Sequence, residues 1–232
     1  MSSLHATRTG LQGQSLDHEG MLTPARSIKG LTGLVNRSTR GESLEKGRDR
    51  ETGGILKTMD ELDLDLGFCR IRPLKFADAA SIAREANDFE IWINLRDRFP
   101  HPYRLEDALA WLGLVVGCSP ATDFAIEVEA QAIGVVGITP GVDVFRRSAE
   151  IGYWLGRGFR GRGITTAAVR EVTRYAFDRF DLIRLQAGVF AWNPASARVL
   201  EKCGYALEGR LRSSVIKNGR ITDQLLYASI RD

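Results

Sequence analysis

The residues most suited to chemistry in this chain form a glycine-rich loop between a predicted strand and a predicted helix. Four glycines fall within eight positions, at Gly156, Gly158, Gly161 and Gly163. Apolar residues alternate before this loop, over 150–155, and recur at helical spacing after it, over 169–180. A loop in this position presents free backbone N–H groups and the positive end of a helix dipole. It therefore suits a phosphate or pyrophosphate group.

The loop by itself leaves the phosphate ligand open. It lacks the Gly-Lys-Ser/Thr of an ATP-type phosphate loop, but 156–161 matches the dinucleotide pattern G-x-G-x-x-G. Dinucleotide-binding folds also need an acidic residue near the end of the next strand, and here 191–193 reads Ala-Trp-Asn. Three interpretations remain. They are a dinucleotide-binding enzyme that uses Gly156, Gly158 and Gly161, a nucleic-acid or protein-binding module that uses the basic loop Arg157–Arg162, and a glycine turn without a ligand.

The charge of the chain speaks against one class of partner. The formal net charge is +3, and residues 59–232 carry 23 basic and 23 acidic side chains. A domain without net charge is a poor match for the phosphate backbone of nucleic acids. We therefore expect no nucleic-acid partner.

Cysteine and histidine are too sparse for several classes of structural and catalytic site. Cys69, Cys118 and Cys203 form no C-x-x-C pair, which predicts neither a disulfide framework nor a zinc site. His101 is the single histidine of residues 59–232, so a His-based triad or metal cluster is not expected. No apolar run reaches the ~18 residues of a membrane span, and the N-terminus lacks the apolar core of a signal peptide. These features predict a cytoplasmic protein without a metal and without a membrane partner.

The loop must be positioned by the strands and helices that surround it in the sequence. Strands are predicted at 68–74, 124–128, 133–138, 150–155 and 183–189, and two more flank Asn218-Gly219, a strong hairpin-turn signal. Four longer helices are predicted at 78–86, 105–116, 169–180 and 193–203, and a short one at 89–95. Strands cluster as hairpins and crossover helices come late. This order predicts an α/β (α+β) domain with a mixed, mostly antiparallel sheet of about seven strands flanked by about four helices.

The first 58 residues differ from the rest in composition. They are rich in Gly, Ser, Thr, Arg and Glu and show no sustained hydrophobic period. We predict a disordered N-terminal extension over 1–58 and one folded domain over 59–232. Met59 begins a cleaner sequence, so the extension could reflect a mispredicted translation start. The alternative is a targeting or partner-binding tail.

The loop and four further segments together resemble the GNAT superfamily of N-acetyltransferases, and within it the RimJ/RimL branch that acetylates ribosomal-protein N-termini. Residues 160–165 resemble the family's R/Q-x-x-G-x-G/A loop, with Thr165 where Gly or Ala is usual. Residues 149–155 resemble an A-E-I-G-Y-W-I strand, and 193–205 resemble an N-x-x-S-x-x-V-L-E-K-x-G-F helix. Residues 94–108 and 208–223 resemble the branch's early segment and its C-terminal hairpin. The resemblance covers about 68–231.

The resemblance implies the GNAT fold, in which two neighbouring parallel strands splay apart and the pantetheine of acetyl-CoA lies between them. Here these strands would be 150–155 and 184–189. It implies acetyl-CoA as co-substrate and a primary amine as acceptor, either a protein N-terminus such as that of a ribosomal protein or a small molecule. Direct attack in a ternary complex is expected because no cysteine is placed to carry an acyl group. The oligomeric state would be a monomer or a homodimer.

The resemblance also implies roles for single residues. Glu150 would act as a base through a water or orient the amine, although a structural carboxylate is an equal alternative. Many family members protonate the CoA thiolate with a tyrosine at the position of Leu200; Ser196, four residues earlier on the same helical face, would donate instead. His101 and Tyr103 would line the acceptor site with Glu150. The implied cofactor-binding residues are Trp154, Leu155, Arg160, Gly161, Arg162, Gly163, Ile164, Thr165, Asn193 and Ser196.

The composition of residues 1–58 generates a first prediction. Because this segment has too little apolar content to dock on a domain, a chain that begins at Met59 should bind acetyl-CoA as the full chain does. Calorimetric titration and thermal unfolding of both chains measure this. A fall of several degrees in Tm would show instead that the extension packs on the domain.

Overall fold

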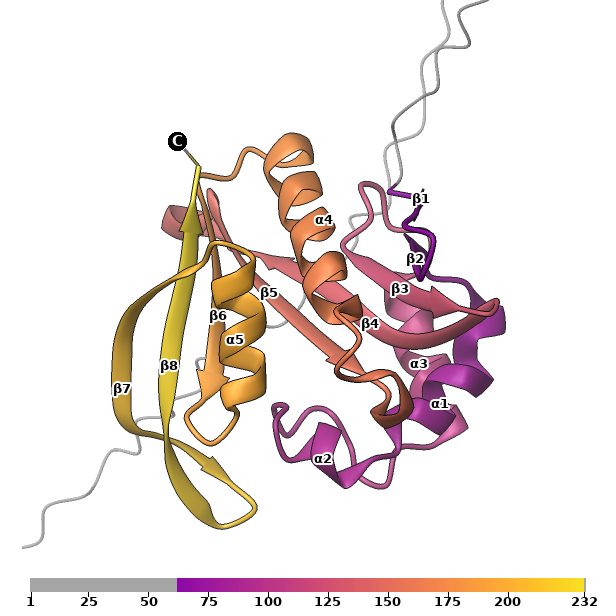
Figure 1. Ribbon diagram of the computed structural model, residues 1–232, viewed down its shortest axis with the longest axis horizontal. Coiled ribbons are helices and arrows are strands. Elements are labelled where there is room, and N and C mark those ends of the chain that lie inside the picture. Colours follow the sequence, from indigo (N-terminus) through magenta and orange to yellow (C-terminus); the bar gives the residue numbers. More distant parts are fainter. Residues whose placement is uncertain (1–61, 232) are drawn as a thin grey trace, which may run out of the picture. The chain divides into compact units, whose positions relative to one another are not determined.

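Eight strands make one sheet in the order β1-β2-β3-β4-β5-β6-β8-β7 (Figure 1). The computed structural model describes residues 62–231, so the extension predicted at 1–58 lies outside the described residues. The strands are β1 Leu64–Asp65, β2 Arg70–Pro73, β3 Asp123–Val128, β4 Gln131–Pro140, β5 Ser148–Leu155, β6 Arg184–Phe190, β7 Ala206–Lys217 and β8 Arg220–Ile230.

The pairing between β5 and β6 differs from all other pairings in this sheet. It is parallel where the others are antiparallel, and it holds for only three residue pairs, from Ser148↔Arg184 to Glu150↔Gln186. Beyond Glu150, β5 stays paired to β4 as far as Leu155, and β6 stays paired to β8 as far as Phe190. The edges of 151–155 and 187–190 that face each other therefore lack strand partners, and Figure 1 shows the two strands diverging. The predicted splay is confirmed.

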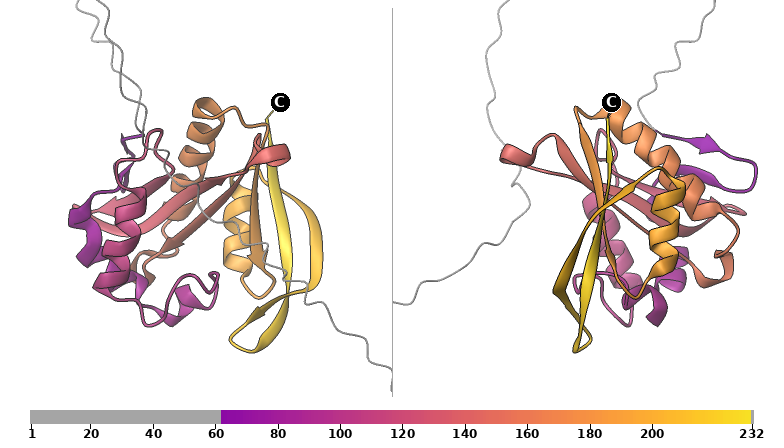
Figure 2. Two further views of the ribbon diagram at one scale, coloured as in Figure 1. Left: turned by 180° about the vertical axis from the view of Figure 1, so that it is seen from behind. Right: turned by 60° about the vertical axis from the view of Figure 1, so that its left-hand side comes forward.

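Helices cover both faces of the sheet (Figure 2). Helices α4 and α5 lie on one face over a core that includes Val169, Val172 and Leu200. Helices α1 and α3 lie on the other face, over a second core that includes Ile82 and Leu112. The α-helices are α1 Ala79–Ala86, α2 Phe89–Trp92, α3 Leu105–Val115, α4 Ile164–Arg179 and α5 Pro194–Lys202, and the 3-10 helices are η1 Phe76–Asp78, η2 Asp143–Phe145 and η3 Arg157–Phe159.

The structure has eight strands and five α-helices in the described range, where the sequence predicted about seven and about four. The extra strand is β1, which pairs with β2 across a tight turn. The Asp65 carboxylate accepts a hydrogen bond from the Gly67 N–H at 2.8 Å, and Gly67 has φ +82°, a conformation that favours glycine. The alternation of leucine with acidic residues over 62–66 was a usable strand signal.

The hairpin predicted around Asn218-Gly219 is confirmed between β7 and β8. Both turn residues have positive φ, +49° for Asn218 and +72° for Gly219. Two-residue hairpin turns of the primed type require this at both positions, and Asn-Gly provides it with least strain. The turn fixes the register that carries Lys217 to the tip of the hairpin.

A buried ion-pair network ties the first strands to η1. The Arg72 guanidinium donates to both carboxylate oxygens of Asp78, at 2.8 and 2.7 Å, and also to Glu127 on β3. The side chains of Arg72 and Asp78 are only 8% and 3% exposed. Removing one member of a buried pair leaves an uncompensated charge, which destabilises far more than the loss of an exposed pair.

We predict that Arg72→Met lowers the free energy of unfolding by about 3 kcal/mol or more, because Asp78 and Glu127 lose their shared partner. The matched control is Arg70→Met, since Arg70 pairs with Asp63 while both side chains are nearly half exposed. That change should lower it by less than about 1 kcal/mol. Urea unfolding of both variants measures the difference, and equal losses would contradict the prediction.

Candidate functional site

The glycine-rich loop connects β5 to α4 and ends in two residues of left-handed conformation. Gly161 has φ +78° and Gly163, which caps the N-terminus of α4, has φ +79°. A Cβ at either position would meet no atom within 4 Å, so the backbone there is open to an incoming group. The first turn of α4 begins at Ile164, and its N–H groups have no partner within the helix. The loop thus has the local geometry of an anion site.

The loop has three arginines, of which Arg160 and Arg162 are differently placed. Arg160 donates to Glu90 at 2.6 Å, to Asp88 at 3.4 Å and to the Leu155 carbonyl oxygen at 3.3 Å. Arg162 is exposed and donates to the Gly158 carbonyl oxygen at 2.9 Å. In this arrangement the Arg160 side chain already has carboxylate partners, whereas the first-turn N–H groups of α4 have none within the helix.

The gap between β5 and β6 adjoins this loop. Side chains of β5 alternate between the two faces of the sheet beside the gap. Trp154 points to the α1–α3 face, where it packs edge-on against Phe99 with ring centroids 6.3 Å apart. Leu155 is buried in the core under α4. Gly152, on the same face as Trp154, is exposed, and a Cβ there would meet nothing within 4 Å. On the α1–α3 side of the sheet, the surface of β5 is therefore uncovered at Gly152.

Glu150 lies at the point where the two strands separate. Both of its carboxylate oxygens accept from Arg96 Nη2, at 2.5 and 2.6 Å. The Glu150 side chain is 34% exposed and that of Arg96 is 56% exposed, so water reaches the pair. Exposed pairs of this kind contribute little to stability. The carboxylate is thus held in place yet accessible.

Residues 88–101, called here the α2 segment, lie across the open end of the gap between the loop and the β7–β8 hairpin (Figure 1). On the loop side, Glu90 contacts Arg160 as described. On the other side, the Asn94 side chain accepts from Trp192 Nε1 at 3.1 Å. At the hairpin tip, Lys217 donates to Asp97 at 2.8 Å. The segment therefore bridges parts of the chain that are far apart in sequence.

Lys217 is nearly inaccessible, with 1% of the residue exposed. Its ammonium group lies 4.0 Å from the centroid of the Trp92 ring, which is a cation–π contact. The His101 ring stacks on the same Trp92 ring, with the two centroids 5.4 Å apart. His101 itself is exposed.

Tyr103 lies in a different environment from His101. It is 6% exposed, belongs to the core on the α1–α3 face, and stacks near Phe99 with centroids 4.7 Å apart. Burial, together with the charge of Asp107, raises the pKa of Tyr103 to about 12. The predicted role of His101 and Tyr103 in acceptor binding stays a prediction.

Asn193 and Ser196 begin α5, as predicted. The Asn193 side chain caps the helix by accepting from the Ser196 N–H at 3.1 Å. The Ser196 hydroxyl is partly exposed and lies 2.9 Å from the hydroxyl of Tyr153 on β5. Leu200 is fully buried in the core. Ser196 and Leu200 lie on the same face of α5. The polar side chain that this pair offers beside the gap is therefore that of Ser196.

The site reveals two features that were missed at the level of sequence. One is the carboxylate pair Asp88 and Glu90, which approaches Arg160 from more than 60 residues away. No local pattern marks this contact. The other is Tyr153, whose position in the alternation of β5 does indicate that its side chain points toward α4 and α5, opposite to Glu150.

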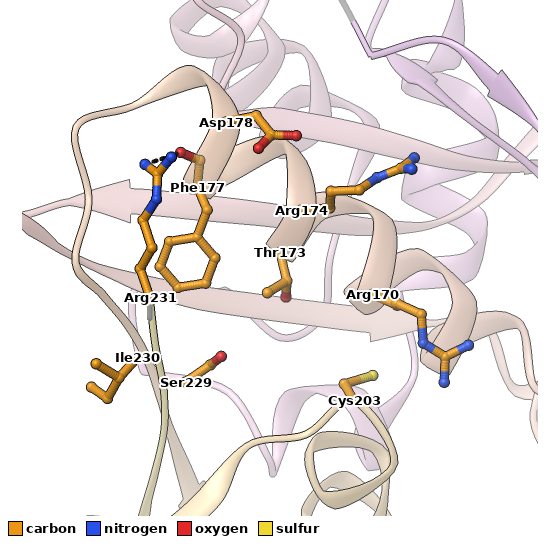
Figure 3. Close-up of a pocket in the computed structure, with 9 residues that line it drawn as sticks. All are labelled: Arg170, Thr173, Arg174, Phe177, Asp178, Cys203, Ser229, Ile230 and Arg231. Atoms are coloured by element: carbon orange, nitrogen blue, oxygen red, sulfur yellow. Dashed lines mark hydrogen bonds between the residues drawn. The ribbon is translucent and has the colours of Figure 1, made fainter.

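A separate cavity of about 400 Å³ lies between α4, the end of α5 and the end of β8 (Figure 3). None of the predicted site residues lines it. Figure 3 shows Arg231 turned toward the Phe177 carbonyl oxygen, while the Arg170 and Arg174 side chains point elsewhere. The nine lining residues are Arg170, Thr173, Arg174, Phe177, Asp178, Cys203, Ser229, Ile230 and Arg231.

Residues 62–231 offer neither a cluster of metal ligands nor a membrane-spanning helix. No group of three or more His, Cys, Asp or Glu side chains in this range is arranged to hold a metal ion. No helix of the described part is long and apolar enough to cross a membrane.

Known proteins resemble this chain in sequence and in structure. The family model of the acetyltransferase (GNAT) domain matches residues 69–206. The Bacillus subtilis protein YdaF is 37% identical over 90 residues, which are 39% of this chain and 49% of YdaF. The ribosomal-protein-serine acetyltransferase of Escherichia coli is 32% identical over 109 residues, which are 47% of this chain and 60% of that enzyme.

One solved structure extends the likeness over more of the chain. The ribosomal-protein-alanine N-acetyltransferase from Brucella melitensis is 27% identical, with a TM-score of 0.57, and the match covers 69% of this chain and 99% of that one. In sequence, by contrast, the chain spans between about half and three fifths of the length of the curated relatives named above.

The geometry of the loop generates a prediction for acetyl-CoA, the ligand that the resemblance implies. A side chain on Gly163 would strain the left-handed backbone and crowd the open N–H groups, so Gly163→Val should weaken acetyl-CoA binding at least about tenfold. Gly158→Ala is the matched control, because Gly158 has no positive φ and a Cβ there meets nothing within 4 Å. Thr165→Ala should hold or improve affinity. Calorimetry measures all three, and normal binding by Gly163→Val would exclude this loop as the phosphate site.

Proposed function

This chain belongs to the acetyltransferase (GNAT) domain family, and we propose that it transfers the acetyl group of acetyl-CoA to a primary amine. The single observation that carries the proposal is the splay of β5 from β6 beside a loop with two left-handed glycines at the start of α4. The gap offers unpaired strand edges to an extended pantetheine arm, and the loop offers N–H groups to a pyrophosphate.

The residues present fit acetyl-CoA better than they fit a dinucleotide. Gly161 and Gly163 leave the backbone open where a pyrophosphate would lie, and the strand edges near Trp154 and Leu155 are free of a β6 partner. Ile164 and Thr165 would contribute first-turn N–H groups, and Asn193 would add an amide beside the gap. Arg160 would exchange its carboxylate partners for phosphate oxygens, which a guanidinium group also matches in shape.

The acceptor proposed is a protein N-terminus, with a small-molecule amine as the second candidate. Names of the relatives support the first, since one is a ribosomal-protein-serine acetyltransferase and another a ribosomal-protein-alanine N-acetyltransferase. Gly152 beside the gap is exposed, and a Cβ there would meet nothing within 4 Å, which is compatible with a peptide acceptor on this face. Relatives named spermidine N(1)-acetyltransferase, 24% identical over 152 residues, keep the small-molecule candidate in the test.

In the proposed reaction the amine attacks the thioester directly. Glu150, which sits where the strands part, would accept the amine proton through a water or hold the amine in line. Ser196 would donate a hydrogen bond to the sulfur as it leaves. We further propose that the protein works in the cytoplasm as a monomer or homodimer.

The test of this function has two parts. Thermal unfolding with acetyl-CoA, NAD or NADP separates the two phosphate ligands, and only acetyl-CoA should raise Tm, because a ligand that binds the native state stabilises it. CoA release is then measured with peptides that copy ribosomal N-termini beginning in Ser or Ala, and with a panel of polyamines. Stabilisation by NAD(P) alone, or steeply salt-dependent binding of nucleic acid without CoA binding, would overturn the proposal.

For Glu150 we predict that Glu150→Gln lowers kcat by about 10²-fold or more, since general bases contribute factors of that size. Arg96→Met is the matched control, because it removes the partner and keeps the carboxylate. That variant should retain kcat within about threefold. If both variants lost activity equally, Glu150 would be a structural partner of Arg96 and not a base.

A further inference from the structure

One polar contact crosses the gap on the α4–α5 side. The Tyr153 hydroxyl, carried by β5, lies 2.9 Å from the Ser196 hydroxyl and 3.1 Å from the Ser196 carbonyl oxygen, both carried by α5. Sheet pairing between the two halves has already ended at Glu150↔Gln186. The contact therefore joins the two walls of the gap beyond the point where their strands separate.

Ser196 is held from two directions. Its N–H is fixed by the Asn193 side chain at 3.1 Å, which sets the backbone of the first turn of α5. The side-chain partner of its hydroxyl is the Tyr153 hydroxyl. A hydroxyl has one proton to donate and can accept others, so the direction of this hydrogen bond decides where the serine proton points.

The Tyr153 hydroxyl can donate to either oxygen of Ser196. Its phenol is a protonated group at neutral pH, and burial raises its pKa further above the ordinary value. Cys203 and Tyr227 are the other titratable groups near it. When the Tyr153 proton points to the Ser196 oxygen, the serine proton has to point elsewhere, and the gap is the open direction. When the Tyr153 proton points to the Ser196 carbonyl oxygen, the serine proton is turned back toward the phenol.

We propose that Tyr153 is a positioning residue for acetyl transfer, which directs the Ser196 hydroxyl proton at the sulfur of the leaving CoA. This inference rests on the proposed function. In the transfer step the amine nitrogen bonds to the acetyl carbon, and the carbon–sulfur bond breaks with its electron pair on sulfur. The amine proton leaves to Glu150 or water, and the thiolate takes a proton from solvent later.

Neither hydroxyl has to give up its proton in this step. A thiol is more acidic than a phenol or an alcohol, so Ser196 and Tyr153 stay protonated and stabilise the thiolate through two hydrogen bonds in series. Such a chain strengthens each bond through polarisation. Because the charge on sulfur develops during the reaction, the effect belongs to kcat and not to the KM for acetyl-CoA.

The experiment is a double-mutant cycle with Tyr153→Phe and Ser196→Ala. The acceptor is the amine that gives the fastest CoA release in the assay with peptides and polyamines. Each single variant should lower kcat about five- to tenfold and leave the KM for acetyl-CoA nearly unchanged. The double variant should be no slower than Ser196→Ala by more than about twofold, because Tyr153 acts through the serine. Losses that multiply would overturn the inference, and so would a Tyr153→Phe enzyme with normal kcat.

Tyr205→Phe is the matched control. Tyr205 is buried where Tyr153 is partly buried, and burial likewise raises its pKa, but its hydroxyl pairs with Thr173 at 2.7 Å and not with Ser196. It should keep kcat while losing stability comparable to that of Tyr153→Phe. An equal loss of kcat in Tyr205→Phe would show that removal of any buried phenol is enough, which overturns the inference.

A second readout needs no acceptor. At a pH of about 9, where a thiol is partly ionised, the wild type should bind CoA several-fold more tightly than CoA that lacks the sulfur. Tyr153→Phe should reduce this preference toward equality, whereas a purely structural tyrosine would weaken both ligands alike. Absence of acetyl-CoA binding in the wild type would overturn the proposed function itself, so the two failures are distinguishable.

Discussion

The early end of the parallel pairing between β5 and β6 is the constraint on which the rest of the structure depends. Each strand remains paired on its outer side, so neither can bend toward the other without breaking a ladder that is already formed. The sheet consequently keeps two unpaired edges in its middle, a situation that sheets normally avoid. Side chains must hold the walls together where the backbone does not, and Tyr153, Ser196 and the α2 segment occupy those positions.

What could be predicted from the sequence was what local chemistry determines. The alternation of 150–155, the glycine-rich loop, the helix that begins at Asn193 and the Asn218-Gly219 turn all depend on neighbours within a few residues. The resemblance to a known family added the splay, which no local pattern shows. Its functional residues remain proposals, although the structure places Glu150, Ser196 and the loop around one gap.

The rest could not be predicted because it depends on contacts between distant residues. Glu90 reaches Arg160 across 70 positions, and Asp97 reaches Lys217 across 120. A lysine in a hairpin reads as a solvated charge, yet Lys217 is buried beneath Trp92. The extra strand β1 was different, since the leucine alternation over 62–66 was present and was not used.

The contact between Lys217 and Asp97 sets the order in which the gap can be completed during synthesis. Asp97 leaves the ribosome 120 residues before Lys217. A nascent chain can therefore form β3, β4 and β5 and cover them with α1 and α3, yet it still lacks the hairpin that meets the α2 segment. This contact forms only after the β7–β8 hairpin has been synthesised, so a nascent chain that has not reached Lys217 lacks this link between the hairpin and the α2 segment.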